Sequence, residues 1–257
     1  MDINLNNKVA VITGGTAGIG LAIAELFAQE GASVALCSRS ETNVSNTIDD
    51  FNQRDLTVYG EAVDVSSRES LFDFANTVEK KFGGIDIWVS NAGILTEKKI
   101  IDTTEEQWRQ ILDINLSSIY FGGLIAREKF EKRGAGVLIN AASFASVLPA
   151  VGSGAYAATK AAVVSMTRTL AAELAPLNIR VVGYIPGIID TPMTEKWIGR
   201  KGEVLASQAA LNRTGTAEEI ANVVLFLASD KASFITGTCV EITGGKFCVQ
   251  NPADAWL

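Results

Sequence analysis

The residues best suited to chemistry are Ser143, Tyr156 and Lys160. Tyr156 and Lys160 are four positions apart, so a helix would present the phenol and the ammonium on one face. Ser143 follows the predicted strand 136–140, and the small and apolar residues 144–155 lead from it to the helix that carries the other two. A hydroxyl, a phenol and an ammonium in this order suit proton transfer at a bound ligand.

The sequence contains no histidine, which restricts the chemistry further. This excludes a Ser-His-Asp triad, histidine-ligated zinc and acid–base catalysis by an imidazole. Proton transfer must therefore use tyrosine, lysine, a carboxylate, cysteine or water. We expect no metal site.

A glycine-rich segment near the N-terminus predicts a nucleotide site. Residues 13–20 read TGGTAGIG and join a predicted strand to a predicted helix. They fit the spacing G-x-x-x-G-x-G and not the commoner G-x-G-x-x-G. Small residues let the backbone approach a pyrophosphate, and the start of the helix offers free N–H groups and the positive end of its dipole. The alternative is a tight turn that binds nothing.

The end of the second predicted strand indicates which dinucleotide binds. Folds of this kind often place an acidic residue there, on the ribose hydroxyls of NAD. This chain has Ser38 and Arg39 instead. A guanidinium binds the 2′-phosphate of NADP, which a carboxylate would repel, so we expect NADP(H) to be favoured over NAD(H). The alternative is that Arg39 is a solvated surface residue.

Short apolar runs alternate with longer segments of helical periodicity, which predicts a mostly parallel sheet with helices on both faces. The predicted strands are 8–12, 34–37, 58–63, 85–89, 136–140, 179–185 and 239–242. The predicted helices are 21–30, one that ends at 82, a long one from about 104 to about 132, 154–175 and 220–228. No linker divides the chain, so we expect residues 1–257 to form a single doubly wound, Rossmann-like α/β domain with a seven-stranded sheet. Its ligand should lie at the carboxyl ends of the strands, near the switch point.

Polar signatures predict several helix ends. The pairs with the spacing of a capping box are Ser66 with Glu69, Thr104 with Gln107, and Thr216 with Glu219. Gly83-Gly84 and Pro176 follow two of the helices and should end them.

The composition is that of a globular α/β protein with an acidic surface. Hydrophobic residues make up 47% and charged residues 20% of the chain. The net charge of −7 makes nucleic acid and anionic membranes poor partners. No apolar run is long enough for a transmembrane helix, and the polar start lacks the pattern of a signal peptide. With only three widely spaced cysteines, these features predict a cytoplasmic protein with reduced thiols.

Taken in order, the motifs resemble those of the short-chain dehydrogenase/reductase family over essentially the whole chain. The matching motifs are TGGTAGIG at 13–20, Asp64-Val65, Asn91-Ala92-Gly93, Asn115, Ser143, Tyr156-x-x-x-Lys160, and Pro186-Gly187 followed by Thr191. Ser90 replaces a frequent asparagine before Asn91, and Val182-Gly183 stands where an asparagine is common before the Pro-Gly. Neither departure touches the reacting groups.

The resemblance implies hydride transfer between a nicotinamide cofactor and a carbonyl or alcohol. Tyr156 would give the proton in reduction and take it in oxidation. The pKa of a free phenol is near 10, and the Lys160 ammonium and the oxidised nicotinamide would lower it. Lys160 would also bind the nicotinamide ribose, Ser143 would donate a hydrogen bond to the substrate oxygen, and Asn115 would perturb its helix and hold a water of the proton relay.

The resemblance also implies contacts to the cofactor along the whole carboxyl edge of the sheet. Asp64 and Val65 would contact the adenine, and residues 91–93 would line the ribose region. The other expected cofactor residues are Gly14, Thr16, Gly18, Ile19 and Gly20 of the glycine segment, Ser38 and Arg39, and Pro186, Gly187, Ile189 and Thr191 around the nicotinamide amide.

The substrate pocket is expected to be largely apolar. It should be built from Ile94, Leu95, the segment 144–151, and the segment 193–198 with Trp197, within a mobile lid around 190–215. Such a pocket suits an uncharged ketone or secondary alcohol of modest size. The alternative is that Leu95, Leu148 and Trp197 pack against neighbouring subunits, and the resemblance suggests a homotetramer built through the long helices and the C-terminal segment.

Two other functions compete with reduction of a free ketone. One is reduction of a 3-oxoacyl thioester on an acyl carrier protein, which would need a basic patch beside the pocket. Lys129, Lys132 and Arg133 are candidates, but Glu128 and Glu131 interrupt them, so we rank the free ketone first. The other is a nucleotide-binding regulator without catalysis, which would not need the tyrosine of the Ser143–Tyr156–Lys160 set.

Overall fold

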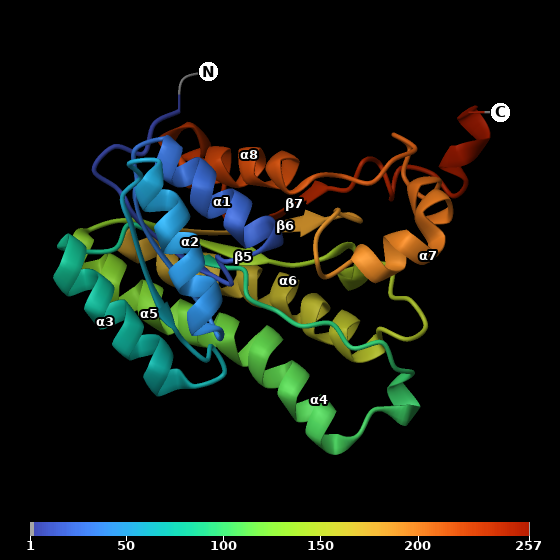
Figure 1. Ribbon diagram of the computed structural model, residues 1–257, viewed down its shortest axis with the longest axis horizontal. Coiled ribbons are helices and arrows are strands. Elements are labelled where there is room, and N and C mark those ends of the chain that lie inside the picture. Colours follow the sequence, from blue (N-terminus) through green and yellow to red (C-terminus); the bar gives the residue numbers. More distant parts are fainter. Residues whose placement is uncertain (1–2, 257) are drawn as a thin grey trace.

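Seven parallel strands form the centre of the molecule. The computed structural model describes residues 3–256, and its sheet has the order β3-β2-β1-β4-β5-β6-β7 with every neighbouring pair parallel (Figure 1). The strands are β1 Val9–Thr13, β2 Ser33–Ser38, β3 Val58–Ala62, β4 Ile87–Ser90, β5 Gly136–Ala141, β6 Ile179–Pro186 and β7 Cys239–Ile242. The predicted single α/β domain with a seven-stranded sheet is confirmed, and the sheet is parallel throughout. The switch point lies between β1 and β4.

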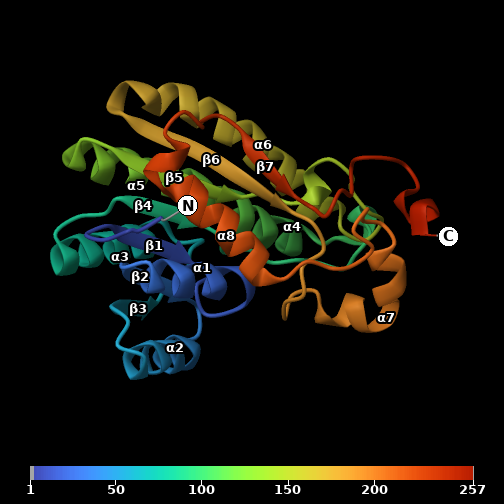
Figure 2. The same ribbon diagram turned by 90° about the horizontal axis from the view of Figure 1, so that it is seen from above.

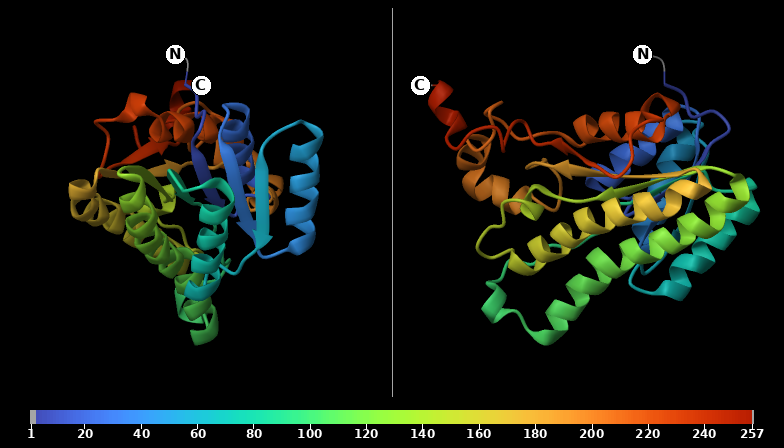
Figure 3. Two further views of the ribbon diagram at one scale, coloured as in Figure 1. Left: turned by 90° about the vertical axis from the view of Figure 1, so that its left-hand side faces the viewer. Right: turned by 180° about the vertical axis from the view of Figure 1, so that it is seen from behind.

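Helices cover both faces of this sheet (Figures 2 and 3). One face carries α1 Gly18–Gln29, α2 Glu41–Gln53 and α8 Ala217–Ala228. The opposite face carries α3 Arg68–Phe82, α4 Glu105–Leu112, α5 Ser118–Arg133 and α6 Gly154–Leu174. Helix α7, Glu195–Ala206, lies beyond the carboxyl ends of the strands (Figure 1). Within residues 3–256, no helix is both long enough and apolar enough to cross a bilayer.

The core has two halves, one on each side of the sheet. Phe27 of α1 and Phe51 of α2 pack against one face, and Phe74 of α3 and Phe130 of α5 pack against the other; all four are fully buried. The central strands are therefore buried on both sides, and all five residues of β1 are buried. This explains why the strands read as continuous apolar runs rather than as alternating ones.

The predicted strand ranges agree closely with the observed ones, but several helix predictions need correction. Helix α7 was not predicted as a helix, because its segment was expected only to form a lid. Helix α2 was not predicted, because most of its thirteen residues are polar and only Val44 and Phe51 are buried. The capping box at Ser66 and Glu69 is wrong. Ser67 caps α3 instead, accepting a hydrogen bond from the amide of Ser70, because the Ser66 amide and hydroxyl are bound to Asp64.

The long helix predicted from about 104 to about 132 is two helices joined by a π-helical turn. Its start is as predicted, because Thr104 and Gln107 form a reciprocal capping box. The chain then follows a π turn at Asp113–Ser117 before α5 begins. Such turns replace the usual i→i−4 hydrogen bonds by i→i−5 bonds and often mark functional positions.

Lys129, a candidate for a basic patch in the sequence, is buried. Its side chain is 1% exposed, and its Nζ donates to Asn76 Oδ1 at 2.6 Å, Glu79 Oε2 at 2.8 Å and Glu128 Oε1 at 2.9 Å. Burial acts to lower the pKa of Lys129, but the hydrogen bonds to the two carboxylates outweigh it and raise the pKa. Lys129 therefore joins α3 to α5 and offers no charge to a partner.

We expect Lys129→Met to destabilise the protein by about 1–3 kcal/mol, because the variant leaves Glu79 and Asn76 without their shared donor. Urea unfolding measures this change. Lys132→Met is the matched control, since Lys132 is exposed and only borders the same carboxylates, and it should change the stability by less than about 0.5 kcal/mol. Equal stability of the two variants would contradict a structural role for Lys129.

Candidate active site

The glycine segment forms a tight turn between β1 and α1. Gly14 and Gly18 have positive φ angles of 68° and 53°, and the amides of Gly14 and Gly15 donate to the Cys37 carbonyl at 2.8 and 3.2 Å. A Cβ at Gly20 would overlap the carbonyl oxygen of Gly14, so this turn requires glycine. Ala17 precedes α1 and provides no side-chain cap. The N–H groups at the start of α1 therefore face outward without a side-chain partner and suit a phosphate.

The end of β2 lies beside this turn. Ser38, Arg39, Ser40 and Asn43 line the same cavity as the glycine segment. Arg39 is exposed and forms no ion pair within residues 3–256. Hydroxyl, amide and guanidinium groups thus converge where the ribose of a dinucleotide would lie.

The side chain of Asn91 connects three strands at the switch point. Its Nδ2 donates to the carbonyls of Thr13 at 3.0 Å and Gly14 at 3.3 Å, and its Oδ1 accepts from the Tyr184 hydroxyl at 2.9 Å. In return, the Thr13 hydroxyl accepts from the amides of Asn91 at 3.0 Å and Ala92 at 3.1 Å. These bonds hold the glycine turn, the end of β4 and the middle of β6 in fixed positions.

Asn115 lies fully buried in the π turn and holds the segment that follows β4. Its Oδ1 accepts from the amide of Ile94 at 2.8 Å, and its Nδ2 donates to the carbonyl of Ile94 at 2.9 Å and to Thr159 Oγ1 at 3.4 Å. The family resemblance implied that Asn115 perturbs its helix, and Asn115 lies in the π turn.

Ser143, Tyr156 and Lys160 lie together beyond the carboxyl end of β5. Ser143 is two residues past the strand and caps the short 3-10 helix Phe144–Ser146. Tyr156 and Lys160 share one face of α6, and Lys160 Nζ lies 5.6 Å from the centre of the Tyr156 ring. Lys160 is 3% exposed, and its Nζ donates to the Ala141 carbonyl at 2.8 Å.

Burial dominates the electrostatics of this group. It lowers the pKa of Lys160 to about 8, because the ammonium lies among neutral groups. Burial raises the pKa of Tyr156, and a hydrogen bond with Ser143 acts in the opposite direction but is smaller. We expected Lys160 to lower the pKa of the Tyr156 phenol, but the groups of the protein itself raise that pKa.

One cavity of about 400 Å³ joins these groups to the glycine turn. Many of the residues predicted to bind the cofactor or to react line it: Gly14, Thr16, Ile19, Gly20, Ser38, Arg39, Asn91, Ala92, Gly93, Tyr156, Lys160, Pro186 and Thr191. The nucleotide-type turn and the proton-transfer pair thus share one space at the carboxyl edge of the sheet.

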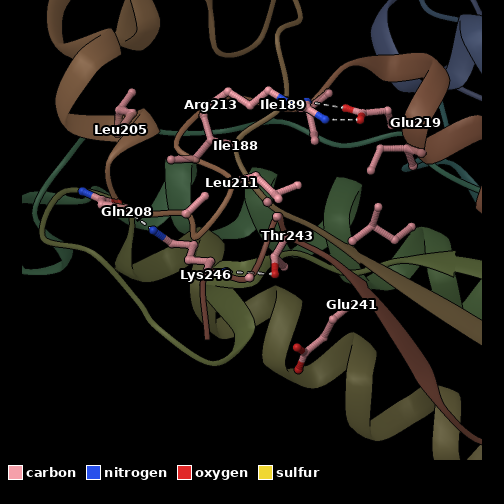
Figure 4. Close-up of a pocket in the computed structure, with 17 residues that line it drawn as sticks. Ile188, Ile189, Leu205, Gln208, Leu211, Arg213, Glu219, Glu241, Thr243 and Lys246 are labelled. Carbon is pink, nitrogen blue, oxygen red and sulfur yellow. Dashed lines mark hydrogen bonds and ion pairs between the residues drawn. The ribbon is translucent and has the colours of Figure 1, made fainter. Parts of the chain in front are cut away.

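The remaining predicted residues do not line this cavity: Gly18, Asp64, Val65, Asn115, Ser143, Gly187 and Ile189. Asp64 lines a neighbouring cavity of about 680 Å³ that also borders Arg39. Gly187 and Ile189 line a separate cavity on the far side of the turn that follows β6 (Figure 4). Val65 and Ser143 are buried.

Comparison with known proteins decides the family. The family model described as enoyl-(acyl carrier protein) reductase matches residues 14–246. The 3-oxoacyl-[acyl-carrier-protein] reductase FabG of Thermotoga maritima is 37% identical, over 95% of this chain and 99% of that protein. The solved structure of a short-chain type dehydrogenase/reductase from Mycobacterium marinum superposes with a TM-score of 0.91 at 30% identity, over 96% of this chain and 98% of that chain. The chain belongs to the short-chain dehydrogenase/reductase family.

Membership of the short-chain dehydrogenase/reductase family establishes the general activity. The chain is an oxidoreductase that acts on alcohol or carbonyl groups with NAD(P). The alternative of a regulator without catalysis is set aside. A further relative, the NAD-dependent glycerol dehydrogenase of Listeria innocua, is 38% identical over 95% of both chains, so relatives of similar identity differ in substrate.

Three residues of this short-chain dehydrogenase/reductase site were not singled out from the sequence. Thr13 and Tyr184 hold the switch point through their hydroxyls, and Asn43 lines the cavity from the first turn of α2. Thr13 could have been found as a polar residue at the end of an apolar strand. Tyr184 could have been found as a phenol within an apolar strand. Asn43 had none, because α2 was not predicted.

We expect Thr13→Val to destabilise the protein by about 1–3 kcal/mol, because the amides of Asn91 and Ala92 lose their common acceptor in a buried position. Thr13→Ser keeps the hydroxyl and should retain most of the stability. Thermal and urea unfolding of both variants measure the difference. A valine variant as stable as the serine variant would show that these hydrogen bonds do not hold the site.

Proposed function

We propose that the chain interconverts a ketone and a secondary alcohol with NADP(H), and that Tyr156 is the general acid and base. The observation that carries the proposal is the single cavity lined by the glycine turn, Arg39, Tyr156 and Lys160. A phosphate cradle, a guanidinium outside any ion pair among residues 3–256, and a proton-transfer pair thus line the same cavity. The cofactor would supply the hydride, and the protein would supply orientation and the proton.

Residues at and beside both ends of this cavity would suit a dinucleotide. At the glycine turn, a Cβ at Gly14 or Gly20 would occupy the space beside backbone groups, and the uncapped start of α1 suits the pyrophosphate. Asp64 and Val65 would border the adenine, and residues 91–93 the ribose. At the other end, Pro186, Gly187, Ile189 and Thr191 would hold the nicotinamide amide.

The proton chemistry follows from burial. With its pKa raised, Tyr156 is a neutral phenol at neutral pH and can give its proton to a carbonyl oxygen during reduction. Oxidation needs the phenolate, which the positive charges of Lys160 and the oxidised nicotinamide would stabilise. Lys160 would also bind the ribose, Ser143 would donate to the substrate oxygen, and Asn115 would hold a water behind Lys160.

Reduction of a free carbonyl fits the charges of the surface better than reduction of a carrier-bound thioester. FabG of Thermotoga maritima is named for a carrier-protein substrate, and the Listeria innocua relative is named for glycerol. A carrier protein would need a basic patch. In this chain Lys129 is buried, Lys132 pairs with Glu79, and Arg133 pairs with Asp86 at 2.9 Å.

Helix α7 and the segment after β4 would form the two sides of the substrate entrance. Arg200 of α7 pairs with Glu97 at 3.1 Å, and Met193 lines the cofactor cavity. This supports a lid within 190–215 that closes over the substrate. Tyr120 on α5 and Trp256 near the C-terminus are exposed, which suits contacts within a homotetramer, and the three free cysteines suit the cytoplasm.

A panel of neutral ketones and secondary alcohols, assayed with NADPH and NADH, tests the activity. Within it, Tyr156→Phe should lower turnover by about two to four orders of magnitude while cofactor affinity stays unchanged, because only the transferable proton is lost. Tyr120→Phe makes the same chemical change at an exposed position and should leave turnover unaffected. Turnover of the Tyr156 variant close to wild type would end the assignment.

Cofactor choice should depend on Arg39. A charge-assisted hydrogen bond to the 2′-phosphate predicts about a tenfold to hundredfold preference in kcat/KM for NADPH over NADH. Arg39→Ala should abolish this preference, and Ser38→Asp should reverse it by repelling the phosphate. Arg127→Ala, at an exposed arginine of α5, is the control. Equal use of both cofactors by the wild type would leave Arg39 an ordinary surface residue.

A further inference from the structure

A second cavity of about 360 Å³ lies behind the turn that follows β6, and the cofactor cavity does not include it (Figure 4). Its walls come from the residues after β6, the segment 205–215, the start of α8 and the segment after β7. Much of the lining is apolar, with Ile188, Ile189, Leu205, Leu211 and Ile242 as the larger side chains. The cavity is large enough for a small organic molecule.

The two ends of the cavity differ in charge. At one end, Arg213 is paired with Glu219 at 2.5 Å and holds the pKa of that carboxyl at about 2. At the other end, the Lys246 ammonium donates to the neutral Gln208 side chain at 2.5 Å. Figure 4 shows Leu211 and Ile188 between these two ends. The positive charge of Arg213 is therefore already matched, and that of Lys246 is not.

Lys246 lacks a counter-ion. It forms no ion pair with any of residues 3–256, although Glu241 also lines the cavity. Its Nζ lies 4.8 Å from the centre of the Phe144 ring, a favourable contact that leaves N–H donors unfilled. Lys246 is half-buried, and this partial burial lowers its pKa, so a negative group bound beside the ammonium would stabilise its charge.

We propose that this cavity binds the carboxylate end of an apolar acid, with Lys246 as the counter-ion. The carboxylate would accept from the ammonium and from the Gln208 amide, and the apolar chain would lie against Leu211, Ile188 and Leu205. A carboxylate at the Arg213 end would gain less, because Glu219 already occupies that guanidinium.

The proposed ligand would touch the active site on two sides. Phe144, under Lys246, is the residue next to Ser143, and Gly187 belongs to the turn expected to hold the nicotinamide. The acid could be the distal end of the substrate or a separate ligand, and both have the same chemistry. Binding without turnover tests the site, so its outcome does not depend on the proposed reaction.

Octanoate is a suitable probe, and octan-1-ol is its neutral counterpart. Calorimetry on the intact protein should give octanoate an affinity at least about tenfold higher than that of octan-1-ol. Lys246→Met should weaken octanoate binding about tenfold to hundredfold and leave octan-1-ol unchanged. Lys80→Met is the matched control, because it removes the same charge from an exposed position on α3 that does not line the cavity.

The comparison of the two probes on the wild type needs no variant, so it stands even if Lys246→Met fails to fold. Equal binding of octanoate and octan-1-ol, no binding at millimolar concentration, or an equal loss in the Lys80 and Lys246 variants would each overturn the proposal. Inhibition of ketone reduction then identifies the source of the ligand. Competition with the ketone would make the acid part of the substrate, and inhibition that ketone cannot relieve would make it a separate ligand.

Discussion

The hydrogen bonds of the Asn91 side chain are the interaction on which the active site depends. The Asn91 amide group donates to the carbonyls of Thr13 in β1 and Gly14 in the glycine turn, and it accepts from the Tyr184 hydroxyl of β6. Parallel strands have no hairpins to fix their ends relative to one another, so this edge needs a side chain that spans several strands. The glycine turn, the segment 91–93 and the β6 exit can keep their relative positions because Asn91 and Thr13 satisfy one another.

Burial then sets the pKa values of the reactive side chains. An ammonium beside the Ala141 carbonyl, with no carboxylate near it, has a pKa of about 8, whereas Lys129, equally buried but surrounded by carboxylates, has a raised one. Both side chains are shielded from solvent, but the Lys160 ammonium meets a carbonyl and the Lys129 ammonium meets carboxylates. Lys129 is therefore stabilised as a structural cation. Lys160 has a pKa close to neutral pH, so a small change in nearby charge alters its protonation.

The sequence was informative where one local rule decides the structure. Buried strands, the glycine turn and two capping boxes depend on the residues themselves, and the structure has them where they were expected. Prediction failed for different reasons at three places. Ser66 has the spacing of a cap but binds the neighbouring Asp64, and α2 buries only two of its mostly polar residues. Lys129 is in a charged stretch but turns inward toward the distant helix α3. The order of the reactive residues could be read from the sequence, but the rise in the pKa of Tyr156 that burial causes could not.

The π turn at Asp113–Ser117 sets the rotational register of α4 against α5. A π turn holds one residue more than the α-helical turn it replaces, so everything before it is rotated by roughly 100° about the axis. Removing a single residue there would let the helix become continuous, and the Asn115 amide would swing away from Ile94. Insertions and deletions in this stretch are thus not neutral changes of length. A one-residue gap in an alignment at this point would separate chains that anchor the segment after β4 from chains that do not.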